Sequence, residues 1–186
     1  MSAYREAVWE AVPADAVPEA FAARRAWLLG RLTPRANVVD LGCGDGSFTA
    51  ELLASGATVI GLDIAESALE RARRRAPRAQ FLVVGEDAAL PVADGWADVV
   101  WAGEVLEHAL DPVGLVLESR RVLRPGGRLL VTTPAHGPLL TRVSLLDPRA
   151  DHLRFFTAHS LRAVLAEAFA QVSVRRRRGR LYACAS

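Results

Sequence analysis

The sequence predicts an α/β protein built on one mostly parallel β-sheet with helices on both faces. Two observations lead to this fold class: short apolar runs alternate along the chain with segments of helical spacing, and most of those runs are apolar at nearly every position. Strands of this kind are buried on both faces, as in a parallel sheet covered by helices. A third observation, two closely spaced runs at the end, predicts that the sheet is not wholly parallel.

Apolar spacing gives the order of the elements. Strands are expected at 38–41, 58–62, 81–84, 97–102, 129–133, 172–176 and 181–185. Helices are expected at 19–32, 47–55, 67–76, 112–123 and 160–169. Together these elements predict a Rossmann-like, seven-stranded sheet.

Local signals fix several element ends. Phe21, Trp27 and Leu28 recur at helical spacing and support the first helix, whereas glycines end the first strand. Pro125-Gly126-Gly127 closes the 112–123 helix. The connection between the last two strands is too short for a parallel crossover, so one of them must run antiparallel at the sheet edge.

Length and composition predict a single domain over residues 1–186, with residues 1–18 as an N-terminal lead-in and 134–156 as a short lid or insertion. The formal net charge of +2 argues against a surface built for nucleic acid or anionic membrane. Cys43 and Cys184 are far apart, which predicts neither a disulfide framework nor a zinc site and indicates a cytoplasmic protein. We expect no membrane span and no signal peptide.

A glycine-rich turn, Asp40-Leu41-Gly42-Cys43-Gly44-Asp45-Gly46, follows the first strand. Its glycines permit positive φ and close approach of a ligand to the backbone, at the sheet edge where open α/β sheets bind ligands. The spacing is D-x-G-x-G-x-G, and a dinucleotide fingerprint would need its third glycine at Ser47. A tight turn without a ligand is the alternative interpretation.

This turn resembles the first motif of the class I S-adenosylmethionine-dependent methyltransferases. Segments 97–108, 122–129 and 151–157 are similar to later motifs of the branch that contains methyltransferase type 11 and ubiquinone-biosynthesis O-methyltransferases. The resemblance runs from about residue 20 to the end. It implies S-adenosyl-L-methionine as cofactor and S-adenosyl-L-homocysteine as product. From the turn, it assigns to cofactor binding Asp40, Gly42, Cys43, Gly44 and Gly46.

Acidic residues after the second and third strands complete the expected cofactor site. Asp63 ends the second strand, where a carboxylate can accept hydrogen bonds from both ribose hydroxyls, and Ile64 follows it. Capping of the next helix is the alternative role for Asp63. Relatives place an acidic residue after the third strand against the adenine amino group. Glu86 and Asp87 both qualify, with Asp87 favoured and Ala88 beside it, unless they are solvated loop charges.

Two further residues are assigned to the cofactor by the resemblance. Ala102 lies at the end of the fourth strand, and Arg24 lies in the first helix, where relatives use an arginine to meet the cofactor's carboxylate. Guanidinium geometry suits that contact. A surface role is the alternative for Arg24.

Histidines that follow two strands are the candidates for catalysis. His108 follows the fourth strand and His136 the fifth, so both are expected at the functional edge of the sheet. Either could orient or deprotonate the methyl acceptor, or serve as a structural histidine. Glu104, Glu107 and His108 would share one face if they lay on a helix, which permits a divalent ion; whether a metal is used stays open.

The sequence therefore predicts a methyltransferase that acts on a small-molecule acceptor, first of all at oxygen. A methyltransferase of RNA or protein and a non-catalytic nucleoside-binding or scaffold protein are the alternatives. Nucleic-acid binding is not expected, because the arginine run 175–178 points to alternating faces of a strand. The acceptor, the oligomeric state and a partner that completes the lid stay open.

Overall fold

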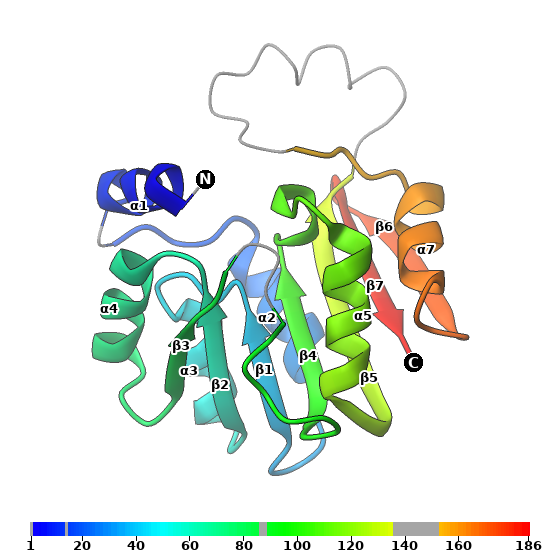
Figure 1. Cartoon of the computed structure of the whole chain (residues 1–186), viewed down its shortest axis with the longest axis horizontal. Helices are drawn as coiled ribbons and strands as arrows, with labels where there is room; N and C mark the ends of the chain where they lie inside the picture. The colour runs from blue at the N-terminus through cyan, green and yellow to red at the C-terminus, as the bar shows by residue number, and fades with distance from the viewer. Residues whose placement is uncertain (1, 14, 86–88, 136–152) are drawn as a thin grey trace.

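The computed structural model describes residues 2–13, 15–85, 89–135 and 153–186. They form a seven-stranded sheet in the order β3-β2-β1-β4-β5-β7-β6 (Figure 1). The strands are β1 (Asn37–Leu41), β2 (Thr58–Asp63), β3 (Gln80–Val83), β4 (Ala97–Gly103), β5 (Leu123–Pro134), β6 (Val172–Arg177) and β7 (Arg180–Ala185). The helices are α1 (Ser2–Ala11), α2 (Phe21–Leu29), α3 (Ser47–Ala54), α4 (Glu66–Arg75), the short 3₁₀ helix η1 (Leu106–His108), α5 (Pro112–Val122) and α7 (Ala158–Ala166).

The sheet is parallel from β3 to β5, and β7 runs antiparallel to both β5 and β6. The predicted mostly parallel sheet, closed by an antiparallel pair at one edge, is thus confirmed. Since β7 is reversed, its first residue, Arg180, pairs with Pro134, at the carboxyl ends of the parallel strands. The C-terminal hairpin therefore contributes a side chain to the edge where ligands bind in such sheets.

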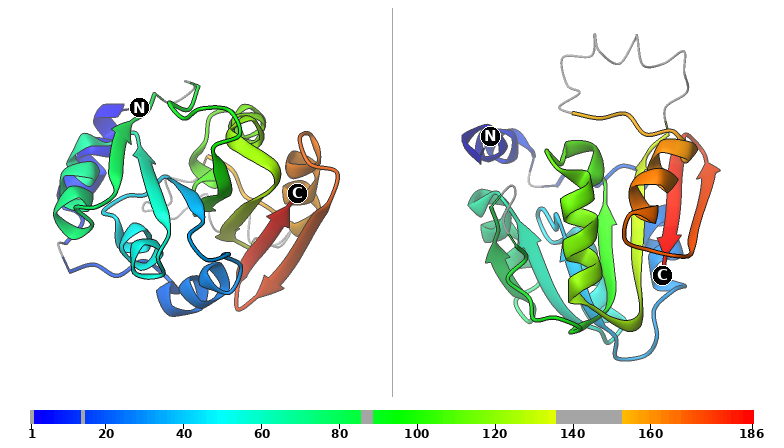
Figure 2. Two further views of the ribbon diagram at one scale, coloured as in Figure 1. Left: turned by 90° about the horizontal axis from the view of Figure 1, so that it is seen from below. Right: turned by 45° about the vertical axis from the view of Figure 1, so that its right-hand side comes forward.

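Two apolar clusters lie on opposite faces of the sheet, because successive strand residues point to opposite sides. Val39 of β1 belongs to the cluster that includes Val116 of α5 and Leu161 of α7. Its neighbour Val38 belongs to the cluster that includes Leu28 of α2 and residues of α3. Figure 2 shows helices on both sides of the sheet, which confirms the layered arrangement expected from the sequence.

The elements differ from the expected ones at two places. Helix α1 lies within the segment predicted to be a lead-in. Strand β5 begins at Leu123, directly after α5, because Ala97 pairs with Leu123 and Val99 with Arg128, so that the Pro-Gly-Gly segment bulges between two paired positions. The Pro-Gly-Gly signal does mark the end of the helix. It lies within β5, however, where it interrupts the pairing with β4, and not before the strand as expected.

The N-terminus lies near the carboxyl ends of the parallel strands, whereas the C-terminus lies on the β7 side of the sheet (Figure 1). Helix α1 lies above α4, near the carboxyl ends of the parallel strands. Ala185 pairs with Leu129, which pairs with Val100 in the middle of β4, so the described chain ends about midway along the strands. No helix in the described ranges is both long enough and apolar enough to span a bilayer.

Candidate functional site

The glycine-rich turn brings its backbone against two apolar side chains. Gly42 has φ +63° and Gly44 has φ +53°, conformations that L side chains rarely adopt. A Cβ atom on Gly42 would lie 2.5 Å from Val105 Cγ2, and one on Gly44 would lie 2.5 Å from Trp9 Cζ2. Glycine is therefore required here both by the backbone conformation and by its close neighbours.

Asp63 ties the end of β2 to this turn. Its Oδ2 accepts a hydrogen bond from Gly44 N at 2.8 Å, and its Oδ1 accepts one from Ala65 N at 3.0 Å. The cap of α4 comes from elsewhere, since Glu6 accepts the N–H groups of Glu66 and Ser67. Each carboxylate oxygen can accept more than one hydrogen bond, so these contacts are compatible with the ribose role predicted for Asp63.

Asp40 and Cys43 support the turn from behind. Asp40 is buried, and its Oδ2 accepts a hydrogen bond from Thr49 Oγ1 at 2.6 Å, which joins β1 to α3. Burial raises the pKa of Asp40 to about 7. Burial also raises the pKa of the Cys43 thiol, which keeps it protonated and unreactive at neutral pH.

A cavity of about 310 Å³ opens beside the turn at the carboxyl ends of β1, β2 and β4. It is lined by Val8, Trp9, Val12, Leu41, Gly42, Asp63, Ile64, Val84, Gly85, Leu90, Glu104, Val105, His108, Ala109, Leu110 and Leu115. The predicted residues on its wall are therefore Gly42, Asp63, Ile64 and His108.

Other predicted residues lie around this wall or outside the described ranges. Arg24, Asp40, Cys43, Gly44, Gly46 and Ala102 belong to neighbouring elements and do not line the cavity. Predicted residues Glu86, Asp87, Ala88 and His136 lie outside the described residues, as does most of the 134–156 lid. Their predicted roles are therefore untested by the geometry.

Beyond the cavity wall, two arginines meet at the ends of β4 and β5. Arg24 is buried, which excludes the surface role; its Nε donates to Thr132 Oγ1 at 3.1 Å and lies 3.9 Å from Glu104 Oε1. Arg180 makes two hydrogen bonds to Glu104, Nε to Oε1 at 3.0 Å and Nη2 to Oε2 at 2.8 Å. Glu104 itself has φ +61°, an uncommon conformation for a side chain other than glycine.

Glu107 is a buried acid behind this pair. Its side chain is 1% exposed, and neither carboxyl oxygen makes a hydrogen bond of ordinary geometry within the described part of the chain. Burial, and then the charge of Glu104, raises the pKa of Glu107 to about 8, so it is mostly protonated at neutral pH. Its backbone oxygen accepts N–H groups from Leu153 at 2.9 Å and Arg154 at 3.1 Å, and so anchors the last described part of the predicted 134–156 lid.

The expected helical face of Glu104, Glu107 and His108 does not form. Only residues 106–108 are helical, in the single turn η1, and Glu104 precedes that turn with a positive φ. Within the described ranges, no three His, Cys, Asp or Glu side chains come together in a way that could hold a metal ion. Spacing alone was misleading here, because the i, i+3, i+4 rule applies only to a continuous α-helix.

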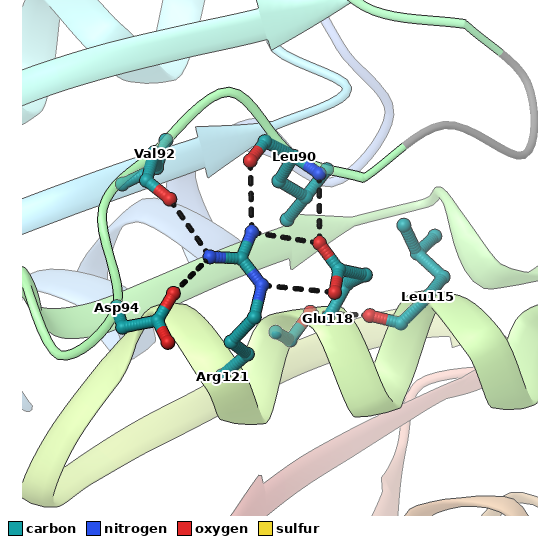
Figure 3. A network of polar contacts seen from close by, with 7 residues as sticks. Leu90, Val92, Asp94, Leu115, Glu118 and Arg121 are labelled. Atoms are coloured by element: carbon teal, nitrogen blue, oxygen red, sulfur yellow. Dashed lines mark hydrogen bonds and ion pairs between the residues drawn. The ribbon is translucent and has the colours of Figure 1, made fainter.

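A clamp on α5 holds the segment that follows β3 (Figure 3). The Arg121 guanidinium donates to Leu90 O at 2.8 Å, to Val92 O at 3.0 Å and to both carboxylate oxygens of Glu118. Glu118 in turn accepts Leu90 N at 2.8 Å, and the hydrogen bonds from Arg121 lower its pKa. The clamp therefore positions Leu90, a cavity residue.

Several site residues were missed by sequence reasoning. Val8, Trp9 and Val12 come from the N-terminal helix, and Arg180 comes from the reversed strand β7. The spacing of Val8 and Val12 is that of one helix face and could have revealed α1. Arg180 contacts Glu104 across 76 residues of sequence, so no local pattern could have paired them.

Comparison with known proteins supports the resemblance to methyltransferases that the sequence indicates. The model of a family described as "Methyltransferase domain" matches residues 39–131, which contain the turn, Asp63 and His108. The protein named "Probable S-adenosylmethionine-dependent methyltransferase" of Mycolicibacterium smegmatis is 44% identical over 99 residues, covering 53% of this chain and 38% of that protein. The 27-O-demethylrifamycin SV methyltransferase of Amycolatopsis mediterranei is 41% identical over 122 residues, covering 58% and 45%.

Solved structures support the fold. A chain from the complex of the Haloferax volcanii Trm112 methyltransferase activator with a methyltransferase superimposes with a TM-score of 0.74 at 21% identity, covering 88% of this chain and 87% of that one. At this identity the likeness concerns the fold alone. This chain also spans less than half the length of the two curated relatives described above.

Proposed function

Because this chain belongs to the methyltransferase-domain family, whose members use S-adenosyl-L-methionine, we propose that it transfers a methyl group from that cofactor to a small molecule. The observation that carries the proposal is the convergence of Gly42, from the turn after β1, and of Asp63 and Ile64, from the end of β2, on one cavity at the carboxyl edge of the sheet. Its volume of about 310 Å³ lies at the small end of the range, about 300–1,000 Å³, found for ligand pockets.

The residues present fit the cofactor. The positive φ of Gly42 and Gly44 leaves an open backbone cradle, and Asp63 lies beside it with carboxylate oxygens able to accept ribose hydroxyls. Arg24 lies 3.9 Å from the cavity residue Glu104 but does not itself line the cavity, so its contact with the cofactor's carboxylate rests on the family resemblance. The proposed cofactor residues are those of the sequence prediction, with Glu86, Asp87 and Ala88 on the segment between Gly85 and Leu90.

When bound, the cofactor supplies a methyl group on a sulfonium that is already activated for transfer. The protein must then position the acceptor, exclude water and, for a hydroxyl acceptor, take up its proton. His108 lines the cavity and is our first candidate, among the described residues, for the group that takes up this proton. His136 stays the second candidate base from the sequence.

Oxygen is proposed as the acceptor atom by analogy. The name of the Amycolatopsis relative describes methylation of a demethylated oxygen, and its similarity to this chain covers 58% of the residues. A base placed at the cavity wall also suits a hydroxyl, which must lose a proton when it is methylated. The identity of the acceptor depends on the shape of the lid and the pocket, so the acceptor of the relative is not assigned to this chain.

The first test is calorimetric titration with S-adenosylhomocysteine, alongside NADH. We expect micromolar binding of S-adenosylhomocysteine, no binding of NADH, and loss of about tenfold or more in affinity for Asp63→Ala, because that variant removes charged hydrogen-bond acceptors. Asp98→Ala, at the far end of the sheet, is the matched control and should bind normally. Absence of binding by the wild type would favour the scaffold alternative and end the enzyme proposal.

The catalytic proposal has its own test. With any acceptor found by screening, His108→Gln should lower turnover by about 10²-fold or more while S-adenosylhomocysteine affinity is kept, as expected for loss of a general base. His159→Gln changes an exposed histidine on α7 and serves as the control. Unchanged turnover in His108→Gln would remove His108 from the mechanism and leave His136 to be tested in the same way.

A further inference from the structure

Helix α1 forms one wall of the cavity. Val8 and Trp9 of α1, with Val12 just after it, face a cavity whose opposite residues include Gly42, Asp63 and Ile64. Figure 1 shows α1 lying across the top of α4, at the edge of the sheet where the turn is found. The N-terminal segment is therefore part of the site, although the match to the methyltransferase-domain model begins only at residue 39.

Trp9 lies directly on the glycine-rich turn. A Cβ atom at Gly44 would be 2.5 Å from Trp9 Cζ2 and 2.7 Å from Trp9 Cη2, so the indole occupies the space that a side chain at 44 would need. Gly44 N is also the donor to Asp63 Oδ2. The indole thus covers the backbone that connects the turn to the proposed ribose-binding carboxylate.

Hydrogen bonds of two side chains, Glu6 and Arg71, hold α1 and the residue after it in this place. Glu6 accepts Glu66 N on its Oε1 at 2.7 Å and Ser67 N on its Oε2 at 3.1 Å, and so caps α4, whose own N-cap, Ala65, makes no side-chain cap. Arg71 Nη1 donates to Val12 O at 2.7 Å. Hydrogen bonds from Ser67 and from the backbone lower the pKa of Glu6, so it is charged at neutral pH, as suits the positive end of a helix dipole.

The rest of α1 is weakly attached. None of its described side chains belongs to the apolar clusters that make the core. The helix has 10 residues, and helices shorter than about 12–15 residues are marginal by themselves in water. A helix of this kind can undock at small cost once its cap contact is lost.

We propose that α1 is a closing element of the cofactor site, in which Trp9 contacts the bound cofactor and Glu6 is the positioning residue that keeps the helix docked. This inference rests on the proposed function. It predicts that the cofactor enters and leaves when α1 undocks, and that Glu6 controls the rate of that step although it does not line the cavity.

The experiment measures S-adenosylhomocysteine binding by stopped-flow tryptophan fluorescence and by calorimetry. In the wild type we expect a fluorescence change on binding that is lost in Trp9→Phe and kept in Trp96→Phe. Trp9→Ala should weaken binding about tenfold, the size of a lost aromatic contact of ~1.4 kcal/mol. A fluorescence change that survives in Trp9→Phe, with unchanged affinity in Trp9→Ala, would overturn the contact.

The role of Glu6 is tested by rates. Loss of a helix cap typically changes an equilibrium about fivefold, so Glu6→Ala should raise the dissociation rate constant about fivefold, and Glu6→Gln, which keeps an acceptor oxygen, should have a smaller effect. Glu10→Ala removes the same charge from an exposed position of α1 that makes no hydrogen bond or ion pair among the described residues, and should match the wild type. Equal rates in Glu6→Ala and Glu10→Ala would overturn this role.

The result separates this inference from the function on which it rests. If no variant and no wild-type protein binds S-adenosylhomocysteine by calorimetry, the proposed function fails. If the wild type binds and Asp63→Ala does not, while Glu6→Ala and Trp9→Ala behave as wild type, the function stands and the inference about α1 is wrong.

Discussion

Where β1 and β2 end, backbone N–H groups hold the acidic side chains in place, whereas arginine side chains do so where β4 and β5 end. On the first side, Asp63 accepts N–H groups from Gly44 and Ala65. On the second, Glu104 is held by Arg180, with Arg24 close by. Backbone donors are fixed by the strands and turn, but an arginine can be lost by one substitution. The second side should therefore be the more sensitive to substitution of a side chain, and the first to a change of backbone conformation.

The largest expected effect is on the arginine side. Arg180→Ala would leave Glu104 without its two hydrogen bonds, and because Glu104 is 18% exposed we expect a cost of about 3 kcal/mol of unfolding free energy, the lower end of the range for a buried ion pair. Urea denaturation would measure it. Arg177→Ala, on the exposed neighbouring strand end, should change stability by less than about 0.5 kcal/mol. Equal stabilities for the two variants would contradict the distinction between the two sides.

The next effect lies in the turn. Gly46 has φ +78°, and a Cβ there would lie 3.0 Å from Ala72 Cα, a backbone atom of α4. Gly46→Ala should therefore cost about 2–3 kcal/mol, from strain in the left-handed conformation plus displacement of α4. Gly126 has the same φ of +78° with nothing within 4 Å of a Cβ, so Gly126→Ala isolates the conformational part, about 1 kcal/mol. If Gly46→Ala loses no more unfolding free energy than Gly126→Ala, then α4 can move away from residue 46 at no measurable cost.

The most gradual effect concerns pH. Because the pKa of Glu107 is raised from 4.5 to about 8, the folded state holds this proton more tightly than the unfolded state. The stability from this group is complete below pH 4.5 and is lost as the pH rises toward 8, by on the order of 1 kcal/mol per pH unit. Glu107→Gln stays neutral, so its stability should fall less steeply with pH. Denaturation series at pH 5 to 8.5 would measure both slopes.

Asp40 offers the same measurement on the other side. Burial raises its pKa from 3.8 to about 7, so the sign is the same and the loss of stability should be complete near pH 7. Asp40→Asn should flatten the profile below pH 7, and Glu107→Gln should flatten it up to about pH 8. Superimposable profiles for wild type and both variants would mean that neither carboxyl is protonated as its burial requires.

The first side was also the more predictable from sequence. The strands β1 and β2, the glycine-rich turn and Asp63 follow one another within 27 residues, from Asn37 to Asp63, and their patterns are local: apolar runs, glycine spacing and an acid at a strand end. The structure places Gly42, Asp63 and Ile64 on the wall of one cavity. Local patterns suffice here because one βαβ unit contains the whole arrangement.

The arginine side of the site and the cavity wall formed by α1 depend on contacts between segments that are distant in sequence. Glu104 meets Arg180 only because β7 runs backwards beside β5, and Trp9 meets Gly44 only because α1 docks on α4. The helical face of Glu104, Glu107 and His108 is absent for a related reason, since the backbone turns at Glu104 before a helix can start. Such contacts are fixed by tertiary packing, which overrides local spacing.

The reversal of β7 has a practical consequence for handling the protein. Ala185 lies beside Leu129, so a polypeptide or surface tether joined after Ser186 starts midway along the strands at the β7 side of the sheet, away from the cavity. A tag joined before Ser2 would instead begin at α1, whose Trp9 lies on the turn. Immobilisation through the C-terminal side should therefore leave ligand exchange free to be measured on a sensor surface, while a bulky N-terminal fusion would obstruct it.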